Sequence, residues 1–422
     1  MNETKRGNFS GSIGFVLAAA GSAVGLGNLW RFPYLAAQYG GGTFLLVYLI
    51  LAVTFGFALM IAEIGIGRKT GLSAIGAYEA LDKRFGFVGV LTALVPIIIL
   101  PYYSVIGGWV IKYFVTFISG SAHAAADDSY FGGFIGSPVE PIGWFFLFIA
   151  LTAIIVLFGV EKGIEKVSKV MMPILAVLTI GIAVYVVTRP GAMDGVLYYI
   201  KPNLKDFSPT TVFAAMGQLF YSMSLAMGIM VTYGSYMKKD NHMEKSVRQI
   251  ELFDTAIAFM AGLMIVPAAY TFYGGSTEEL KKGPTLMFVI LPKVFDQMPG
   301  IMGTVIGVAF FLLVFFAALT SSISLMETVV SNNLTIKVYS DGIRVVYNVS
   351  GSTTINNGVL TNKVSYHPVA DITIPVNINN DGSGAHLRIA TDGGMQYNRS
   401  GSSSVSVTAQ SSATTFLATP LY

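Results

Sequence analysis

Residues 20–33 read AGSAVGLGNLWRFP and lie inside an apolar run that extends from Ile13 to Ala37. A run of this length can cross a bilayer as one helix, since about 20 apolar residues span the hydrocarbon core. Yet its middle carries an asparagine, an arginine and three glycines, which are Gly21, Gly25 and Gly27. Backbone groups left unpaired in hydrocarbon are costly unless they line a polar cavity. The pattern therefore predicts an interruption that serves a site.

The composition of the whole chain indicates a membrane protein. Of the 422 residues, 53% are hydrophobic and 12% are charged, whereas soluble domains carry about 25% charged residues. Cysteine is absent, which excludes disulfides and thiolate metal sites. The net charge of +3 is small and dispersed, so we expect a lipid bilayer around the chain and no nucleic-acid partner.

Eight apolar runs are long enough to span a membrane. They lie near residues 13–37, 43–67, 88–118, 142–160, 167–188, 212–236, 250–273 and 301–330. Lysine and arginine gather in alternate loops, such as residues 68–84 and 238–248, while the loop at residues 122–140 contains neither. The positive-inside rule therefore predicts a multi-pass protein of the inner (cytoplasmic) membrane with a cytoplasmic N-terminus. The first run is too long for the core of a cleavable signal peptide, so we expect none.

The composition changes abruptly near residue 332. Residues 332–422 are rich in Ser, Thr, Asn and Gly and contain no apolar run of spanning length. Residues 334–349 read LTIKVYSDGIRVVYNV, an alternation around a turn that is typical of a β-hairpin. We expect two domains: an all-α membrane domain at residues 1–331, and a β-rich tail at residues 332–422, for which an origin foreign to the membrane domain is one interpretation.

A second interruption lies in the sixth apolar run. Residues 217–228 read GQLFYSMSLAMG, with glycines at both ends and two serines between them. Interrupted helices five spans apart are typical of transporters built from inverted repeats, in which the two breaks meet at the bilayer midplane. Alternatively, the glycines of the first run permit close helix packing and nothing more. Arg31, Glu63 and Asp254 are ionisable residues within predicted spans, where such residues are functional by default.

Six motifs occur in order along the first 331 residues. They are GSAVGLGNLWRFP, GGGTFLLVY, AEIGIGR, YYSVIGGW, GQLFYSMSLAMG and FFAALTSSISLM. Together they closely resemble the motifs of the neurotransmitter:sodium symporters, bacterial amino-acid branch. The resemblance implies a LeuT-like fold with helices 1 and 6 broken, and sodium-coupled symport of an amino acid by alternating access. Members have eleven or twelve helices, so it also implies a chain truncated after helix 8, with one partner of each gate missing.

The resemblance implies two sodium sites and no organic cofactor. The first would use Ala23, Asn28, Ser222 and Asp254 together with the substrate carboxylate. The second would use Gly21, Val24, Ala317, Thr320 and Ser321. Asp254 stands where many members have Asn, and Ala258 where chloride-dependent members have Ser, so we expect chloride-independent transport. Two alternatives stay open: Asp254 could face a loop, and the hydroxyls of Thr320 and Ser321 could bond within their own helix.

The implied substrate pocket is mostly large and apolar. Its residues would be Ala23, Leu26, Gly27, Ile99, Tyr103, Tyr221, Ser224, Met227, Ser321 and Leu325. None of these side chains could pair with a charged substrate side chain, so we expect a neutral hydrophobic or aromatic amino acid. The gates would use Arg31 and Gln218 outside, and Arg6 and Tyr236 inside. Arg31 could instead extend to the membrane interface.

Two other functions are compatible with the sequence. One is an amino-acid-binding membrane sensor that has a cytoplasmic β-module. The other is a non-functional fusion of a transporter fragment with an unrelated, phage-like surface β-module. An enzyme is not expected, because the chain shows no nucleophile–base pair and no cluster of metal ligands. No oligomeric state is predicted.

Overall fold

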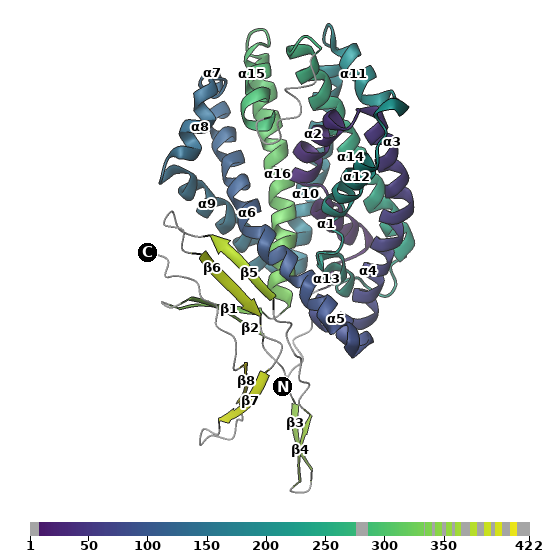
Figure 1. The fold of residues 1–422 in the computed structure, drawn as a ribbon, viewed down its shortest axis with the longest axis vertical. Helices are drawn as coiled ribbons and strands as arrows, with labels where there is room; N and C mark the ends of the chain where they lie inside the picture. Colours follow the sequence, from purple (N-terminus) through teal and green to yellow (C-terminus); the bar gives the residue numbers. More distant parts are fainter. Residues whose placement is uncertain are drawn as a thin grey trace. The chain divides into compact units, whose positions relative to one another are not determined.

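The structure is a computed structural model that describes residues 8–275 and 286–332, together with the backbone of eight strands between residues 334 and 411 (Figure 1). The chain forms two compact units. One comprises residues 1–73 and 94–328, and the other comprises residues 74–93 and 329–422.

The first apolar run folds as a broken helix. Helix α1 (Ser12–Ala23) ends where Val24 adopts an extended conformation, with φ −75° and ψ 101°. The chain resumes as the π-helical turn η1 (Gly27–Arg31) and helix α2 (Phe32–Gln38). The two halves of this span are bent by 48°. The interruption that the glycines predict therefore lies at residues 24–26.

The sixth apolar run is also broken. Helix α12 (Pro209–Ser222) and helix α13 (Ile229–Ser235) are separated by residues 223–228. Within this loop Ser224 and Ala226 have φ values of 54° and 58°. The left-handed conformation costs a residue with a Cβ about 1–2 kcal/mol. Contacts with the surroundings must therefore hold the loop in place.

Helix α13 packs backbone against backbone on helix α4 (Phe57–Thr70). A Cβ added to Gly67 would overlap the carbonyl oxygen of Val231, and a Cβ added to Gly234 would overlap that of Ile64. Both glycines are therefore required by the close approach of the two helices.

The remaining apolar runs form long helices. They are α3 (Gly42–Leu51) continued through η2 (Ala52–Gly56) into α4, α6 (Gly86–Ile118), α9 (Glu140–Leu157), η4 (Val160–Glu165) continued into α10 (Lys166–Val187), α14 (Met243–Phe272) and α16 (Met302–Ser331). By length and composition, six helices of the described residues could cross a membrane, or seven if α1 and α2 count as one span. The one predicted span not counted among these seven is the sixth apolar run, which forms the broken pair α12 and α13 with 14 and 7 residues.

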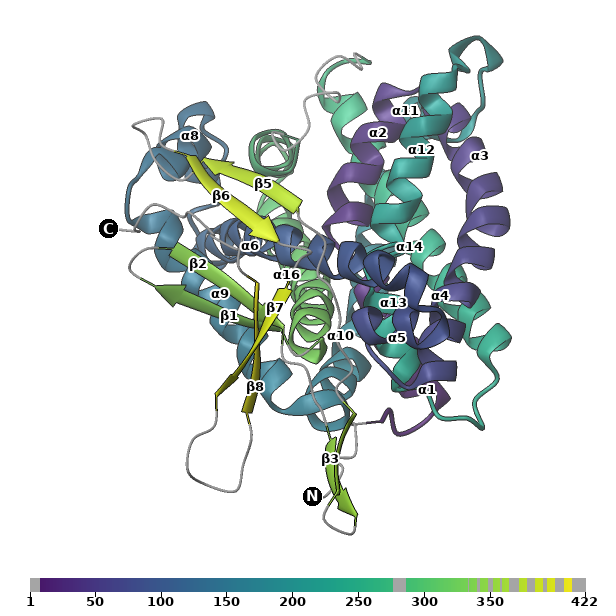
Figure 2. The same cartoon turned by 60° about the horizontal axis from the view of Figure 1, so that its bottom comes forward.

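Short helices connect these spans. They are α5 (Ala74–Leu81), η3 (Lys83–Phe85), α7 (Ala122–Ala125), α8 (Asp128–Gly136), α11 (Ala192–Ile200), η5 (Leu204–Asp206), η7 (Leu286–Ile290) and α15 (Leu291–Asp296). In both overall views α16 lies between α8 and α9 on one side and α1, α2 and α12 on the other (Figure 1 and Figure 2). Helix α14 packs against α1, α2, α4, α10 and α11, so it connects many helices of the unit that comprises residues 1–73 and 94–328.

The tail contains four antiparallel strand pairs. They are β1 (Leu334–Tyr339) with β2 (Gly342–Tyr347), β3 (Ser352–Asn356) with β4 (Val359–Lys363), β5 (Ile372–Asn377) with β6 (Gly384–Ile389), and β7 (Gly393–Asn398) with β8 (Ser406–Ser411). The first pair sets Tyr339 opposite Gly342. The side chains of the strands and the residues between them lie outside the described part of the chain, so the β-rich domain stays a prediction.

Candidate functional site

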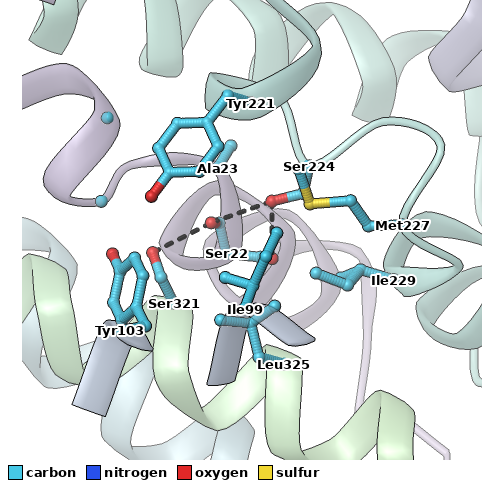
Figure 3. A pocket seen from close by; sticks show the side chains of 12 residues that line it. Ser22, Ala23, Ile99, Tyr103, Tyr221, Ser224, Met227, Ile229, Ser321 and Leu325 are labelled. Carbon is cyan, nitrogen blue, oxygen red and sulfur yellow. Dashed lines mark hydrogen bonds between the residues drawn. The ribbon is translucent and has the colours of Figure 1, made fainter. Parts of the chain in front are cut away.

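The two helix breaks meet in the core. Ser22 and Ser224 are 202 positions apart in the sequence, yet their hydroxyl oxygens are 3.2 Å apart (Figure 3). The Ser224 hydroxyl also donates to the carbonyl oxygen of Ser22 at 3.1 Å. Both residues are buried. These bonds tie the end of α1 to the loop between α12 and α13.

A small cavity of about 20 Å³ lies beside these serines (Figure 3). Nine of the ten predicted substrate residues line it, namely Ala23, Gly27, Ile99, Tyr103, Tyr221, Ser224, Met227, Ser321 and Leu325. The tenth, Leu26, has its amide N–H donating to the Tyr103 hydroxyl at 2.9 Å. Ser22, Gly25 and Ile229 are further lining residues that the sequence analysis missed. The lining contains hydroxyls and apolar groups, and none of its described residues is charged.

Glycine at the first break makes room for neighbouring side chains. A Cβ on Gly25 would overlap the Ser321 hydroxyl and lie 2.5 Å from the hydroxyl of Tyr103. A Cβ on Gly27 would lie 2.9 Å from a ring carbon of Tyr221. Neither glycine is among those with a positive φ in the described chain. The close packing that the sequence leaves as an alternative therefore occurs together with the break.

A fully buried carboxylate lies next to the first break. The Asn28 amide donates to Asp254 Oδ1 at 2.7 Å, and the Ser222 hydroxyl lies 3.0 and 3.1 Å from its two oxygens. The Tyr48 hydroxyl, which the sequence analysis missed, donates to Oδ2 at 3.4 Å. Asp254 thus faces the core rather than a loop, and Ala23 lines the neighbouring cavity. Among the described residues all these partners are neutral, so the site suits a cation with oxygen ligands.

A second cluster joins α16 to the end of α1. The Ser321 hydroxyl lies 3.3 Å from the carbonyl oxygen of Gly21, 3.0 Å from that of Ser22 and 3.3 Å from that of Val24. Three carbonyl oxygens therefore converge on one hydroxyl. Because carbonyl and hydroxyl oxygens are ligands for hard cations, this donor set also fits sodium.

The neighbouring threonine behaves differently. The Thr320 hydroxyl donates to the carbonyl oxygens of Phe316 and Ala317 at 2.9 and 3.2 Å, which is the bonding within its own helix that the sequence leaves open. Thr320 still lies beside the first break, since a Cβ on Gly21 would be 3.3 Å from its Cβ. The five residues predicted for the second sodium site are therefore brought together, with Thr320 bonded to its own helix.

The predicted outer gate residues form a polar bridge to residues that line the cavity. The Arg31 guanidinium donates to Gln218 Oε1 at 2.8 Å, and Gln218 Nε2 donates to the Gly27 carbonyl oxygen at 2.9 Å. The guanidinium carbon also lies 5.5 Å from the ring centroid of Tyr221. Arg31 is therefore engaged with cavity residues instead of extending away from them.

On the predicted inner side, the Tyr236 hydroxyl donates to Glu327 Oε1 at 2.6 Å. Glu327 lies within α16 and is not among the residues predicted for the gates. Arg6, the other predicted inner gate residue, lies outside the described residues. The Phe9 amide N–H, three positions further on, donates to the Tyr236 carbonyl oxygen at 3.2 Å.

Glu63 of α4 supports the second break. Its Oε1 accepts the amide N–H of Ala226 at 2.7 Å, and the residue is 8% exposed. Ala226 is one of the two loop residues with a left-handed backbone. The carboxylate therefore satisfies a backbone donor that the interruption of the helix leaves free.

A multi-pass helical protein whose two broken helices enclose a cavity has the architecture of a secondary transporter. The profile of the sodium:neurotransmitter symporter family matches residues 6–129 and 139–350, and the chain belongs to this family. The match runs past residue 331, where the predicted membrane domain ends. Because this is a family of symporters, the expectation that the chain is not an enzyme is confirmed.

Relatives of known sequence and structure agree with this assignment. An uncharacterized sodium-dependent transporter of Bacillus subtilis, YhdH, is 40% identical over 339 residues, which are 78% of this chain and 73% of that protein. An uncharacterized sodium-dependent transporter of Haemophilus influenzae is 34% identical over 348 residues, covering 78% and 74%. The crystal structure of MhsT in complex with L-phenylalanine is similar with a TM-score of 0.72 and 39% identity, covering 78% of this chain and 74% of MhsT.

Proposed function

We propose that the chain is a symporter that couples the entry of sodium to that of a neutral hydrophobic or aromatic amino acid. It would work by alternating access in the cytoplasmic membrane, with its N-terminus in the cytoplasm. The observation that carries this proposal is the contact between the two breaks around one cavity, with the buried carboxylate of Asp254 beside it. The crystal structure of MhsT with L-phenylalanine supports an amino acid as the substrate.

The backbone at the breaks would hold the two charged groups of the amino acid. Its carboxylate would accept the amide N–H groups of Leu26 and Gly27 and the Tyr103 hydroxyl, near the positive end of the half-helix that begins there. Its ammonium would donate to carbonyl oxygens near Ala23 and Tyr221. The uncharged lining supports a neutral substrate side chain, because a charged one would be buried without a partner.

The cavity volume of about 20 Å³ is roughly the room that one water molecule needs. A side chain of the size of leucine or phenylalanine therefore requires lining residues to move. Met227 is suited to this, because methionine is unbranched and adapts its shape readily. We expect affinity to depend on substrate size, with each methylene group contributing about 1–3 kcal/mol.

Two sodium ions would occupy the two oxygen clusters. Ala23, Asn28, Ser222 and Asp254 would hold the first, and Gly21, Val24, Ala317, Thr320 and Ser321 the second. Sodium would supply positive charge next to both Asp254 and the substrate carboxylate. Binding of the ion would therefore favour binding of the amino acid, and the reverse. Ala258, one turn after Asp254 and fully buried, offers no hydroxyl for chloride. The fixed charge of Asp254 supports transport that is independent of chloride.

Uptake of radiolabelled L-phenylalanine into proteoliposomes tests the proposal. We expect accumulation when sodium is higher outside, none when potassium replaces sodium, and no change when gluconate replaces chloride. Leucine and tryptophan should compete, whereas lysine and glutamate should not. Loss of uptake in gluconate would overturn chloride independence alone. Sodium-dependent binding without any uptake would instead favour the sensor function.

A further inference from the structure

The segment that precedes α1 is hydrogen-bonded both to the π-helical turn η4 and to residues that follow α13. The Ser10 amide N–H donates to Glu165 Oε2 at 2.7 Å, and the Ser10 hydroxyl donates to Glu165 Oε1. The Lys238 ammonium donates to the Ser10 carbonyl oxygen at 2.8 Å, and the Phe9 amide bonds to Tyr236. We call this arrangement of residues 9 and 10 with these partners the N-terminal anchor.

Glu165 is the buried member of the anchor. It ends the π-helical turn η4, at the entrance to α10, and its side chain is 1% exposed. Lys169, one turn later, lies 2.6 Å from its Oε1 and also donates to the Ser10 hydroxyl at 3.2 Å. A Cβ on Gly14 would overlap the carboxylate. Glu165 therefore fits into a space that exists because α1 has a glycine at this position.

Helix α1 also contacts α10 seven residues beyond the contact of Gly14 with Glu165. A Cβ on Gly21 would lie 3.2 Å from the sulfur of Met172 and 3.3 Å from Thr320 Cβ. Both Gly21 and Met172 are seven positions beyond the first contact pair, Gly14 and Glu165. Residues seven apart lie on one face of a helix, about 10.5 Å apart along its axis. The interface of α1 with α10 thus runs continuously from the anchor to the residues proposed for the second sodium site.

We propose that Glu165 is a positioning residue of the transport cycle. Its carboxylate holds residues 9–10 and α1 against α10, and so keeps the cytoplasmic route to the second sodium site closed. This inference rests on the proposed function. Opening that route requires the Ser10 bonds to break. Lys169 would stay on Oε1 of Glu165, whereas Oε2 would lose its Ser10 donor and must gain water instead. The anchor therefore couples opening to the entry of water at η4.

The absence of cysteine from the chain makes a direct test available. Ser246 of α14 is fully buried, and its hydroxyl lies 3.3 Å from that of Ser12 at the start of α1. In Ser246→Cys, the rate of modification by a charged methanethiosulfonate reagent in inside-out vesicles reports how often this region opens. Adding Glu165→Gln should raise that rate by about tenfold, since one hydrogen bond to a charged group contributes that much. The rate should also become less sensitive to sodium.

Matched variants separate positioning from general damage. Glu161→Gln alters an exposed carboxylate in the same π-helical turn and should leave the rate unchanged. Glu165→Asp should restore part of the protection. Gly14→Ala, which displaces the carboxylate, and Lys238→Met, which removes an exposed donor, should both raise the rate. Lys238→Met keeps the test valid if the buried variants fail to fold.

Equal rates in the parent, Glu165→Gln and Lys238→Met proteins would overturn the inference, even if thermal stability fell. Sodium-dependent binding of L-phenylalanine is measured on the same Ser246→Cys sample. Absence of that binding would contradict the proposed function, whereas the labelling rates alone decide the role of Glu165. The two results are therefore distinguishable.

Discussion

The two helix breaks face the same cavity but are built in different ways. The first, at residues 24–26, lies among glycines that adopt no left-handed conformation and are needed for room. The second, at residues 223–228, places Ser224 and Ala226 in the left-handed region and has its glycine at the end, at Gly228 with φ 69°. In the first break, glycines are needed because a side chain would overlap its neighbours. In the second break, residues with side chains adopt backbone angles that glycine adopts more easily.

This difference shows how each break is stabilised. At the first, the Ser321 and Tyr103 side chains fill the space beside Gly25. At the second, a single carboxylate from another helix, Glu63, accepts the amide of Ala226. The first break is therefore sensitive to added volume, and the second is sensitive to the backbone preference of its residues.

The largest effect is expected from Gly25→Ala, which tests the space requirement of the first break. The added methyl group would overlap the Ser321 hydroxyl, and overpacking of this kind costs about 1–3 kcal/mol, so binding should weaken by up to about 100-fold. Sodium-dependent binding of L-phenylalanine to the purified protein measures this. Gly181→Ala on α10, where a Cβ meets nothing within 4 Å, is the control. Parental affinity in Gly25→Ala would contradict the space requirement.

An intermediate effect is expected from Asp254→Asn, which keeps the shape of the side chain beside the first break but removes its charge. Loss of one partner of a buried charge pair costs at least about 2 kcal/mol. The sodium concentration for half-maximal binding should therefore rise by about 30-fold. Glu244→Gln, at an exposed position of the same helix, should change nothing. An unchanged sodium concentration for half-maximal binding in Asp254→Asn would show that this carboxylate does not contribute to sodium binding.

The smallest effect is expected from Ala226→Gly in the second break. Glycine removes the left-handed strain of about 1–2 kcal/mol but adds a conformational entropy cost of about 0.5–1 kcal/mol. The midpoint of thermal unfolding, followed by tryptophan fluorescence, should therefore rise by about 1–3 °C. Ala261→Gly in the middle of α14 should lower it, because glycine is unfavourable in a helix. If the midpoint of thermal unfolding also fell in Ala226→Gly, the backbone at residue 226 would carry no strain.

Much of the cavity could be predicted because the motifs that interrupt helices also line it. Asn28 and Asp254 are conspicuous as polar residues in apolar runs, and they are in contact. Tyr48 carries no such signal, because an aromatic residue in an apolar run is compatible with simple burial. Its bond to Asp254 depends on how α3 and α14 pack, which a linear pattern does not contain.

Glu165 and Glu327 could not be identified for a different reason. Glu165 is flanked by Lys162, Lys166 and Lys169, so the charge pattern resembles a membrane interface. The signal lies elsewhere, at Gly14, where the absence of a side chain makes room for the carboxylate. Glu327 sits at the end of an apolar run, where an acidic residue is unremarkable until α13 presents Tyr236 to it.

The seven-residue helix α13 has a mechanical consequence for the cycle. So short a helix does not persist alone, because few backbone bonds must offset the cost of starting it. It depends on α4, against which Gly67 and Gly234 allow direct backbone contact. Since α4 also supplies Glu63 to Ala226, the loop and the helix that follows it share one support. We therefore expect a force that tilts α13 to reach α4 directly through this backbone contact.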